Sequence, residues 1–290
     1  MIRTIASSIL VLSLLASAEV ATATTVVVPP GPGTPVQDAI DAAQPGDTIR
    51  LTLGNYPEQI VITKALKLRG VRSTAVSPNI TTSLVGSCAA TPVITIAADS
   101  VQVRGITVVG DSGGGIAVTA RTNVKLRDMF VASNCPSVVA PAIDIEQSTR
   151  VTMNHVWAAG MGNRPVGPAG IRIADTPADG RVRLATSIAG GYDVGVLLEN
   201  DATGSVLISQ NYINFSDKGV VVQNTSGATL EHNRQIFNNT TSGIEIDATS
   251  TDNLILANNI SGSVTDVVDN GTGNCWRKNV FTTGSVPVCP

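Results

Sequence analysis

Ser242-Gly243-Ile244-Glu245-Ile246 holds two branched apolar residues two positions apart. Successive side chains of a β-strand point to opposite faces, so this spacing predicts a strand with one buried face. Near-copies recur upstream, and their first branched residue stands at positions 94, 116, 143, 171, 196, 220 and 244. The steps between these positions are 22, 27, 28, 25, 24 and 24 residues, which indicates an internal structural repeat.

Each repeat carries further strand patterns. The second apolar pairs are Val101 and Val103, Val124 and Leu126, Val151 and Met153, Val182 and Leu184, Val206 and Ile208, Ala228 and Leu230, and Leu254 and Leu256. The third are Ile106 and Val108, Met129 and Val131, and Val156 and Ala158. A unit of three short strands cannot close its own core, whereas stacked units can. The sequence therefore predicts an all-β parallel β-helix, in which each strand pairs with its equivalent about 4.8 Å away.

Three asparagines fall at one position of the repeat. Asn211, Asn233 and Asn259 each stand three residues after the second apolar pair. We expect these amides to hydrogen-bond to one another inside a turn, which is a structural role.

The composition and the N-terminus limit the function. The chain has 290 residues, 43% of them hydrophobic and 14% charged, and a net charge of -3, which gives no electrostatic basis for binding nucleic acid. Arg3 and the apolar run 5–16 predict a secretory signal peptide over 1–23, cleaved after Ala23. No segment is long and apolar enough for membrane insertion. We expect a secreted monomer with one mature domain over 24–290.

The four cysteines are Cys88, Cys135, Cys275 and Cys289. Cys275 and Cys289 are close in sequence, so we expect them to staple a last coil over about 265–290. Cys88 and Cys135 would then form a second disulfide, although other pairings stay open. Zinc binding is the alternative, but no Cys-x-x-Cys spacing is present.

One helix is expected over about 34–44. Thr34 can cap it with Gln37 as reciprocal partner, Pro35 takes the first helical position, and Val36 and Ile40 lie on an apolar stripe. Such a helix would cover the open N-terminal end of the stacked core. By contrast, 72–92 loses the repeat pattern, and we expect a loop there.

The segment 36–71 reads VQDAIDAAQPGDTIRLTLGNYPEQIVITKALKLRGV. It resembles the N-terminal part of secreted right-handed parallel β-helix proteins of the pectin lyase-like superfamily, and Asn274-Cys275-Trp276 resembles the C-terminal finish of some bacterial members. The resemblance implies the fold and a secreted location. Enzymes of the superfamily act on acidic polysaccharides, but the complete motifs of polygalacturonases, pectate lyases and pectin methylesterases are absent. The repeats also resemble those of nitrous oxide reductase accessory proteins, which would imply a periplasmic accessory role.

An outward column of aromatic residues is expected on the third strand. The position four beyond the second pair holds Phe130, Trp157, Ile188, Tyr212 and Arg234. A flat ridge of rings suits the faces of sugar rings. Alternatively, the long loops 133–141 and 160–169 fold over these rings and bury them.

Charged residues adjoin this column: Lys125, Arg127 and Asp128 in one repeat, Asn154 and His155 in the next, and Arg183 in the third. In a lyase, Arg127 or Arg183 would neutralise a uronate carboxylate, and His155 or Lys125 would remove a proton. Asp128 completes the catalytic hypothesis, and Lys125, Asn154, Phe130, Trp157 and Tyr212 would bind substrate. The alternative is a solvated charged surface.

Acidic residues mark the outward face of the first strand: Asp144, Glu146, Glu199, Glu245 and Asp247. Calcium binding is one interpretation; an ion pair between Asp144 and Arg172 is another. We expect no other cofactor. The sequence thus predicts a secreted β-helix protein that engages an acidic polysaccharide, either as a lyase or hydrolase with a non-standard site or as a non-catalytic binding or structural protein.

Overall fold

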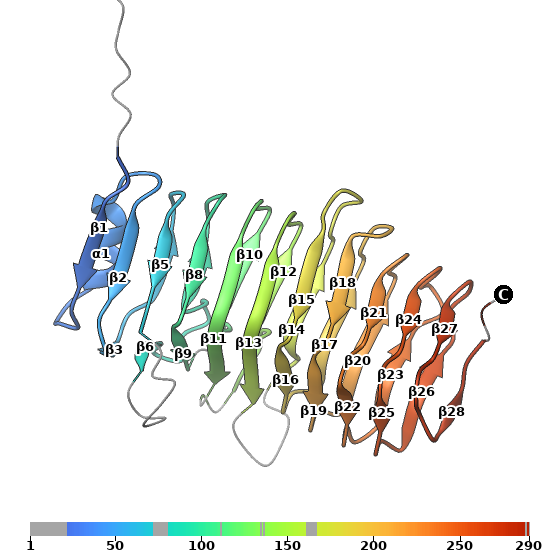
Figure 1. Ribbon diagram of the computed structural model, residues 1–290. Coiled ribbons are helices and arrows are strands. Elements are labelled where there is room, and N and C mark those ends of the chain that lie inside the picture. The colour runs from blue at the N-terminus through green and yellow to red at the C-terminus, as the bar shows by residue number, and fades with distance from the viewer. Residues whose placement is uncertain are drawn as a thin grey trace, which may run out of the picture.

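The computed structural model describes residues 22–71, 81–110, 112–133, 135, 137–160, 167–287 and 289. Within them the chain winds into a parallel β-solenoid whose coils follow one another along one axis (Figure 1). Nearly all of the expected signal peptide, 1–21, lies outside the described residues.

The first strands of the coils form a sheet of ten parallel strands in the described chain. They are β4 (Ile60–Ile62), β7 (Ile94–Ile96), β10 (Ile116–Thr119), β12 (Ile143–Glu146), β14 (Ala169–Ala174), β17 (Val194–Glu199), β20 (Lys218–Gln223), β23 (Ser242–Ile246), β26 (Thr265–Asp269) and β28 (Gly284–Ser285). The seven repeat positions are in register from Ile94 to Ile244, as predicted.

The second and third strands form the other sheet, of eighteen described strands. The second strands are β1 (Thr25–Val28), β2 (Thr48–Leu51), β5 (Lys67–Arg69), β8 (Gln102–Arg104), β11 (Lys125–Ser133), β13 (Thr152–Gly160), β15 (Val182–Ala185), β18 (Val206–Ser209), β21 (Thr229–Glu231), β24 (Leu254–Leu256) and β27 (Cys275–Arg277). The third strands are β3 (Gly54–Tyr56), β6 (Thr82–Val85), β9 (Thr107–Val109), β16 (Ile188–Gly190), β19 (Tyr212–Asn214), β22 (Gln235–Phe237) and β25 (Ile260–Ser261). β11 and β13 run through both positions.

The core consists of columns of inward branched side chains. Ile116, Ile143, Ile171, Val196 and Val220 are successive members of one column, and none is more than 1% exposed. Each residue packs on its equivalents in the neighbouring coils because the coils pair in register. Apolar area buried in this way contributes about 25 cal/mol per Å². One continuous core thus runs through the solenoid.

From β8 to β25, a corner separates the second strand from the third in each described coil. The residue at the corner has a positive φ, as in Asp128 (53°) and His155 (52°). Side chains other than glycine adopt this left-handed conformation infrequently, and Asn, Asp and His adopt it most readily. The further corner residues are Gly105, Thr186, Gln210, His232, Ala257 and Lys278. Because the chain bends here, the side chains of Asp128 and His155 lie on the outer edge of the solenoid.

The predicted asparagine ladder exists, but one of its members was assigned one residue too late. Asn211 Nδ2 donates to Asn233 Oδ1 at 3.0 Å, and Asn233 Nδ2 donates to Asn258 Oδ1 at 2.8 Å. Asn258 is buried and Asn259 is exposed. The same one-residue error affects β24, where Ile255 points inward instead of Leu254 and Leu256.

The expected loop over 72–92 is in part a strand. β6 pairs in parallel with β3 and β9, and Leu84 is fully buried. Residues 72–80 lie outside the described chain. The repeat therefore continues through this segment, with an insertion before the third strand.

Helix α1 (Pro35–Ala42) lies at the N-terminal end of the solenoid, beside β1 and β2 (Figure 1). Val36 and Ile40 are buried in the common core. The expected Thr34–Gln37 capping box is absent: Glu58 accepts the N–H groups of Val36 (3.1 Å) and Gln37 (3.0 Å) instead. That this helix protects the end of the core stays a prediction.

Both expected disulfides are present. Cys88 is bonded to Cys135, and Cys275 to Cys289. The first links loops 47 residues apart in sequence, and the second holds the segment after β27 to that strand. Zinc binding by these cysteines is therefore excluded, since no free cysteine exists in the described chain.

Candidate functional site

Asp128 is the centre of a charged cluster at the corner of β11. Its carboxylate accepts a hydrogen bond from Arg104 Nε at 2.8 Å, and Arg127 Nε lies 3.6 Å from the same oxygen. His155 Nδ1 lies 3.5 Å from the other carboxylate oxygen. The side chains of Arg104, Arg127 and His155 are each more than half exposed, whereas that of Asp128 is 22% exposed. The carboxylate therefore holds three side chains that can carry positive charge on one outer edge.

Most of the predicted charged residues lie around one hollow. Lys125, Arg127, Asn154 and His155 line it, together with Thr186, and its volume is about 320 Å³. Asn154 Oδ1 accepts a hydrogen bond from Thr186 Oγ1 at 3.0 Å, which holds the amide. The hollow has room for part of a sugar unit, with cations on its wall.

Arg183 lies outside this lining. Lys125 pairs in register with Thr152, and Thr152 pairs with Arg183, so Arg183 lies two coils beyond Lys125. The Arg183 side chain is exposed. The structure thus brings Lys125, Arg127, Asp128, Asn154 and His155 together and leaves Arg183 at their margin.

The aromatic column is present but is not a flat ridge. Phe130 pairs in register with Trp157, Trp157 with Ile188, and Ile188 with Tyr212. The rings of Phe130 and Trp157 meet edge to face, with centroids 5.2 Å apart and planes at 81°. Trp157 is 42% exposed and Phe130 is partly exposed, so the described residues do not bury these rings. The column therefore offers one half-exposed indole rather than a continuous ridge of rings.

Arg234 does not belong to this column, contrary to the prediction. Gln235 is the register partner of Tyr212, because the turn before β22 contains one extra residue. The Arg234 guanidinium nevertheless lies 5.9 Å from the centre of the Tyr212 ring, within cation–π distance. Tyr212 is thus engaged by a neighbouring coil and is partly exposed.

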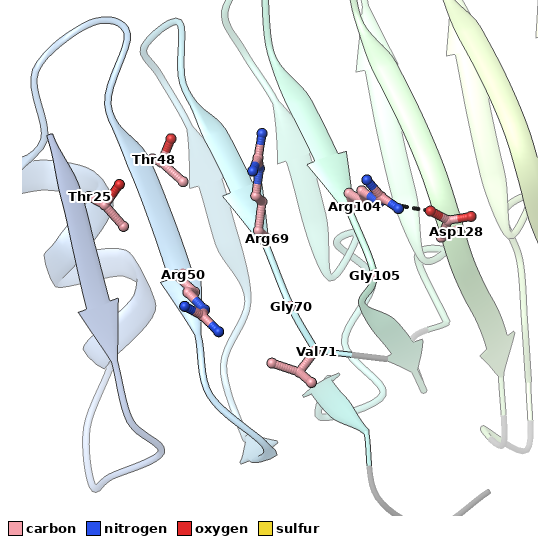
Figure 2. A pocket seen from close by; sticks show the side chains of 9 residues that line it. All are labelled: Thr25, Thr48, Arg50, Arg69, Gly70, Val71, Arg104, Gly105 and Asp128. Carbon is pink, nitrogen blue, oxygen red and sulfur yellow. Dashed lines mark hydrogen bonds and ion pairs between the residues drawn. The ribbon is translucent and has the colours of Figure 1, made fainter. Parts of the chain in front are cut away.

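Sequence reasoning missed three arginines that continue the cluster. Arg50, Arg69, Arg104 and Arg127 are in register on four successive coils, and we call them the arginine row. A signal was present: Leu66-Lys-Leu-Arg69, Val101-Gln-Val-Arg104 and Val124-Lys-Leu-Arg127 share an arginine after two inward apolar residues. Figure 2 shows Arg50, Arg69 and Arg104 projecting from neighbouring strands.

The opposite sheet carries paired charges. Arg172 Nη1 donates to Asp144 at 3.1 Å and Arg172 Nε donates to Glu199 at 3.0 Å, so the predicted Asp144–Arg172 pair is confirmed. Burial raises the pKa of Asp144, although Arg172 opposes that shift. Burial also lowers the pKa of Arg172, but its hydrogen bonds to Glu199 and Asp144 outweigh this and leave the pKa raised.

Glu245 and Asp247 have partners as well. Lys218 Nζ donates to Glu245 at 2.8 Å, and Asp247 accepts from the hydroxyls of Thr249 and Ser250. In the described chain no three acidic, histidine or cysteine side chains gather as a metal site. The interpretation as a calcium site therefore has no geometric support among these residues.

The fold and the exposed face together define a parallel β-solenoid with a cationic outer edge. A family model described as periplasmic copper-binding protein (NosD) matches residues 76–286, and the chain belongs to that family. No curated protein sequence matches the chain. The membership confirms the predicted right-handed parallel β-helix of the pectin lyase-like type.

Several solved structures share the fold at low identity. The A-module of mannuronan C-5 epimerase AlgE4 from Azotobacter vinelandii is 15% identical with a TM-score of 0.56, covering 86% of this chain and 83% of that chain. A mannuronic acid specific family 6 polysaccharide lyase from the human gut microbiota is 12% identical with a TM-score of 0.61, covering 88% of this chain and 65% of that chain. ORF18 of Geobacillus virus E2 is 12% identical with a TM-score of 0.56, covering 88% and 61%. The chain thus spans less than two thirds of two of these relatives, and the likeness shows the fold alone.

The donor set of the described residues does not fit a copper centre. Copper prefers thiolate, thioether and imidazole ligands. The cysteines are in disulfides, and Met129 and Met153 are fully buried in the core. His155 and His232 occupy corners three coils apart, roughly 14 Å at about 4.8 Å per coil. These two imidazoles cannot share one metal ion.

The described residues contain no helix long and apolar enough to cross a membrane. The two disulfides fit an oxidising compartment.

Proposed function

We propose that this protein binds an acidic polysaccharide over the outer edge formed by β11 and β13. The observation that carries the proposal is the hollow lined by Lys125, Arg127, Asn154 and His155. Cations that face solvent there can pair with uronate carboxylates, and charge-assisted hydrogen bonds to carboxylates are about twice as strong as neutral ones. The Trp157 indole beside them offers an apolar face to a sugar ring. The polysaccharide lyase and the epimerase that share the fold support this substrate class.

We place this activity outside the cytoplasm. The family is described as periplasmic, and the disulfides favour an oxidising compartment. Acidic polysaccharides of the cell envelope and surroundings would be accessible there. Fractionation of cells followed by immunoblotting tests the location, and a cytoplasmic protein with reduced cysteines would contradict it.

Binding can be measured with purified protein and a panel of pectins, alginates and glycosaminoglycans, by isothermal titration calorimetry. We expect micromolar to millimolar binding to at least one uronate polymer and none to a neutral glucan. Lys125→Gln/Arg127→Gln should weaken it roughly tenfold or more, because two charged contacts are lost. Unchanged binding by this variant, or no binding by the native protein, would contradict the proposal.

A second function, cleavage by a lyase, is favoured by His155 beside Asp128 and two arginines. In a β-elimination, Arg127 would neutralise the uronate carboxylate and His155 would take the C5 proton while the C4–O4 bond breaks; Lys125 could then protonate the leaving oxygen. The product carries a new C4–C5 double bond that absorbs in the ultraviolet. The assay follows this absorbance together with reducing ends.

His232 provides a matched control for this test. It is exposed, occupies the same corner position three coils away, and lies 3.8 Å from Glu231. His155→Ala should abolish product formation and His232→Ala should not. Binding without any product would leave the binding function and eliminate the lyase.

A further inference from the structure

We propose that the arginine row is a carboxylate-binding track that extends the hollow toward the N-terminus and sets the direction of a bound polyuronate along the solenoid axis. The proposal rests on the polysaccharide-binding function and adds the substrate class and its orientation.

The four arginines form a row by strand register. Arg50 pairs with Arg69, Arg69 with Arg104, and Arg104 with Arg127. Equivalent atoms of adjacent coils are about 4.8 Å apart. Figure 2 shows the first three on neighbouring strands β2, β5 and β8, with the Arg50 and Arg69 side chains pointing in different directions and Arg104 bonded to Asp128.

Few acidic side chains neutralise the positive charge of the arginine row. Asp128 pairs with Arg104 and Arg127 at its C-terminal end, and among the described residues Arg50 and Arg69 form no salt bridge. Two lysines lie two positions before arginines of the row: Lys67 and Lys125 both pair in register with Gln102 of the coil between them. This positive stripe stands out because the whole chain has a net charge of -3.

A purely structural explanation does not account for the row. The asparagine ladder stabilises the fold because its amides are buried and bonded to one another. Guanidinium groups have only donors, so neighbouring arginines cannot bond to one another, and like charges opposite each other in a sheet are unfavourable. All four side chains are exposed, so they do not fill the core either. An anion that binds along the row would relieve the repulsion.

The surface over the row is hollowed. Arg50, Arg69 and Arg104 line a depression of about 670 Å³ with Gly70, Gly105 and the polar side chains of Thr25, Thr48 and Asp128. A Cβ atom on Gly70 would clash with the Gly105 carbonyl oxygen and with Ile106, so this turn packs closely beneath the row. The hollow reaches Asp128, and the Asp128 carboxylate contacts Arg127 and His155, which line the other hollow.

A linear polyuronate fits this track better than nucleic acid. The strands that carry one arginine each are about 4.8 Å apart, and this backbone spacing is comparable with the length of one sugar unit in an extended uronate chain. Along one strand of duplex DNA there is one phosphate per ~3.4 Å of helix axis, which does not match. The track also leads toward Trp157, a surface for a sugar ring rather than for a stacked duplex.

The test compares two double variants that lose equal charge. Arg50→Gln/Arg69→Gln removes the N-terminal half of the row. Arg277→Gln/Lys278→Gln is the control, and both residues are exposed. In the last coil, Arg277 occupies the strand position of the row arginines and Lys278 occupies the corner that follows it. Circular dichroism melts confirm that both variants are folded. Calorimetry then measures binding of oligouronates of three and of eight sugars, at several salt concentrations, with duplex DNA of equal charge alongside.

We expect the row variant to bind the octamer at least about tenfold more weakly than the native protein, since two charged contacts are lost. Its trimer affinity should be unchanged, because a trimer can bind in the Lys125–His155 hollow alone. The control variant should match the native protein for both.

The possible failures are distinguishable. If the native protein binds the octamer and the row variant binds it equally well, the track is wrong and the binding function stands. A similar loss in the control variant, or DNA bound as tightly as the octamer, also overturns the track as a uronate site. If the native protein binds no oligouronate, the binding function and the track fall together.

Discussion

At the scale of single residues, Asn258 and Asn259 show how one position separates a structural amide from an exposed one. Asn258 accepts from the backbone N–H of Asn233 at 3.0 Å and donates to the carbonyl of Leu230 at 2.9 Å. Its side chain also donates to Asn279 Oδ1 at 2.9 Å. The Asn259 side chain is exposed.

Replacement of these neighbours by alanine should therefore have unequal effects. Asn258→Ala leaves buried donors and acceptors without partners, so we expect the free energy of unfolding to fall by about 2–4 kcal/mol. Asn259→Ala should change it by less than about 0.5 kcal/mol. Urea denaturation monitored by circular dichroism measures both. Equal losses in the two variants would contradict the ladder.

Asp201 is a buried carboxyl group that should give the protein a pH-dependent stability. Burial raises its pKa to about 6, although Oδ1 accepts the N–H of Thr176 at 2.9 Å. Oδ2 is buried without a partner in the described chain. Because the pKa in the folded state exceeds the value of 3.8, the folded state holds the proton more tightly than the unfolded state.

The stabilisation is thus full below about pH 4 and is lost as the pH rises to about 6, by at most about 3 kcal/mol. Asp201→Asn should abolish this part of the pH dependence of stability, because an amide does not titrate. The stability curves of the native protein and the variant should therefore differ in shape. Melting temperatures measured from pH 4 to pH 7 test this. Parallel curves for the native protein and the variant would show that Asp201 does not titrate in this range.

At the scale of elements, helix α1 depends on a residue outside itself. The Glu58 carboxylate caps two free N–H groups, while the Thr34 hydroxyl contacts only Asp38, at 3.1 Å. Glu58→Ala should lower the free energy of unfolding by about 1–2 kcal/mol, a typical loss for a helix cap. Thr34→Ala should have little effect. A larger loss from Thr34→Ala than from Glu58→Ala in denaturant unfolding would contradict this assignment.

The positions of elements could be predicted where apolar and polar residues alternate clearly. The prediction failed where they do not alternate. The pair Ile244 and Ile246 has a polar residue between its members, so its parity is fixed. Leu254-Ile255-Leu256 is apolar throughout, so the sequence does not show which of these side chains point inward. The prediction therefore chose Leu254 and Leu256 as the inward pair and Asn259 as the ladder residue. The Glu58 cap was not predictable from local sequence. It joins residues 22 and 21 positions apart, and the partners of its carboxylate are backbone N–H groups.

The candidate site was predicted in part for the same reason. Lys125, Arg127, Asp128, Asn154 and His155 lie on strands whose register follows from adjacent repeats. The arginine row crosses the insertion over 72–80, where the repeat pattern is interrupted, so the alignment of Arg69 with Arg104 required the structure. Side-chain orientation, such as the edge-to-face contact of Phe130 with Trp157, does not follow from register.

At the scale of the whole molecule, in-register stacking converts a repeated sequence position into a linear surface feature. The same geometry produces a buried amide ladder at the turns of the C-terminal coils and an exposed arginine row on strands of the N-terminal coils. None of the four disulfide cysteines lies on a strand of the arginine row. A long, linear ligand is the kind that such a surface can bind along its length.

The most direct test of this account is a crystal structure of the protein with an octameric oligouronate. The account predicts sugar density along the solenoid axis, with carboxylates beside Arg69 and Arg104 and a ring near Trp157. An oligosaccharide bound on the opposite sheet, beside Asp144 and Arg172, or lying across the axis would contradict it.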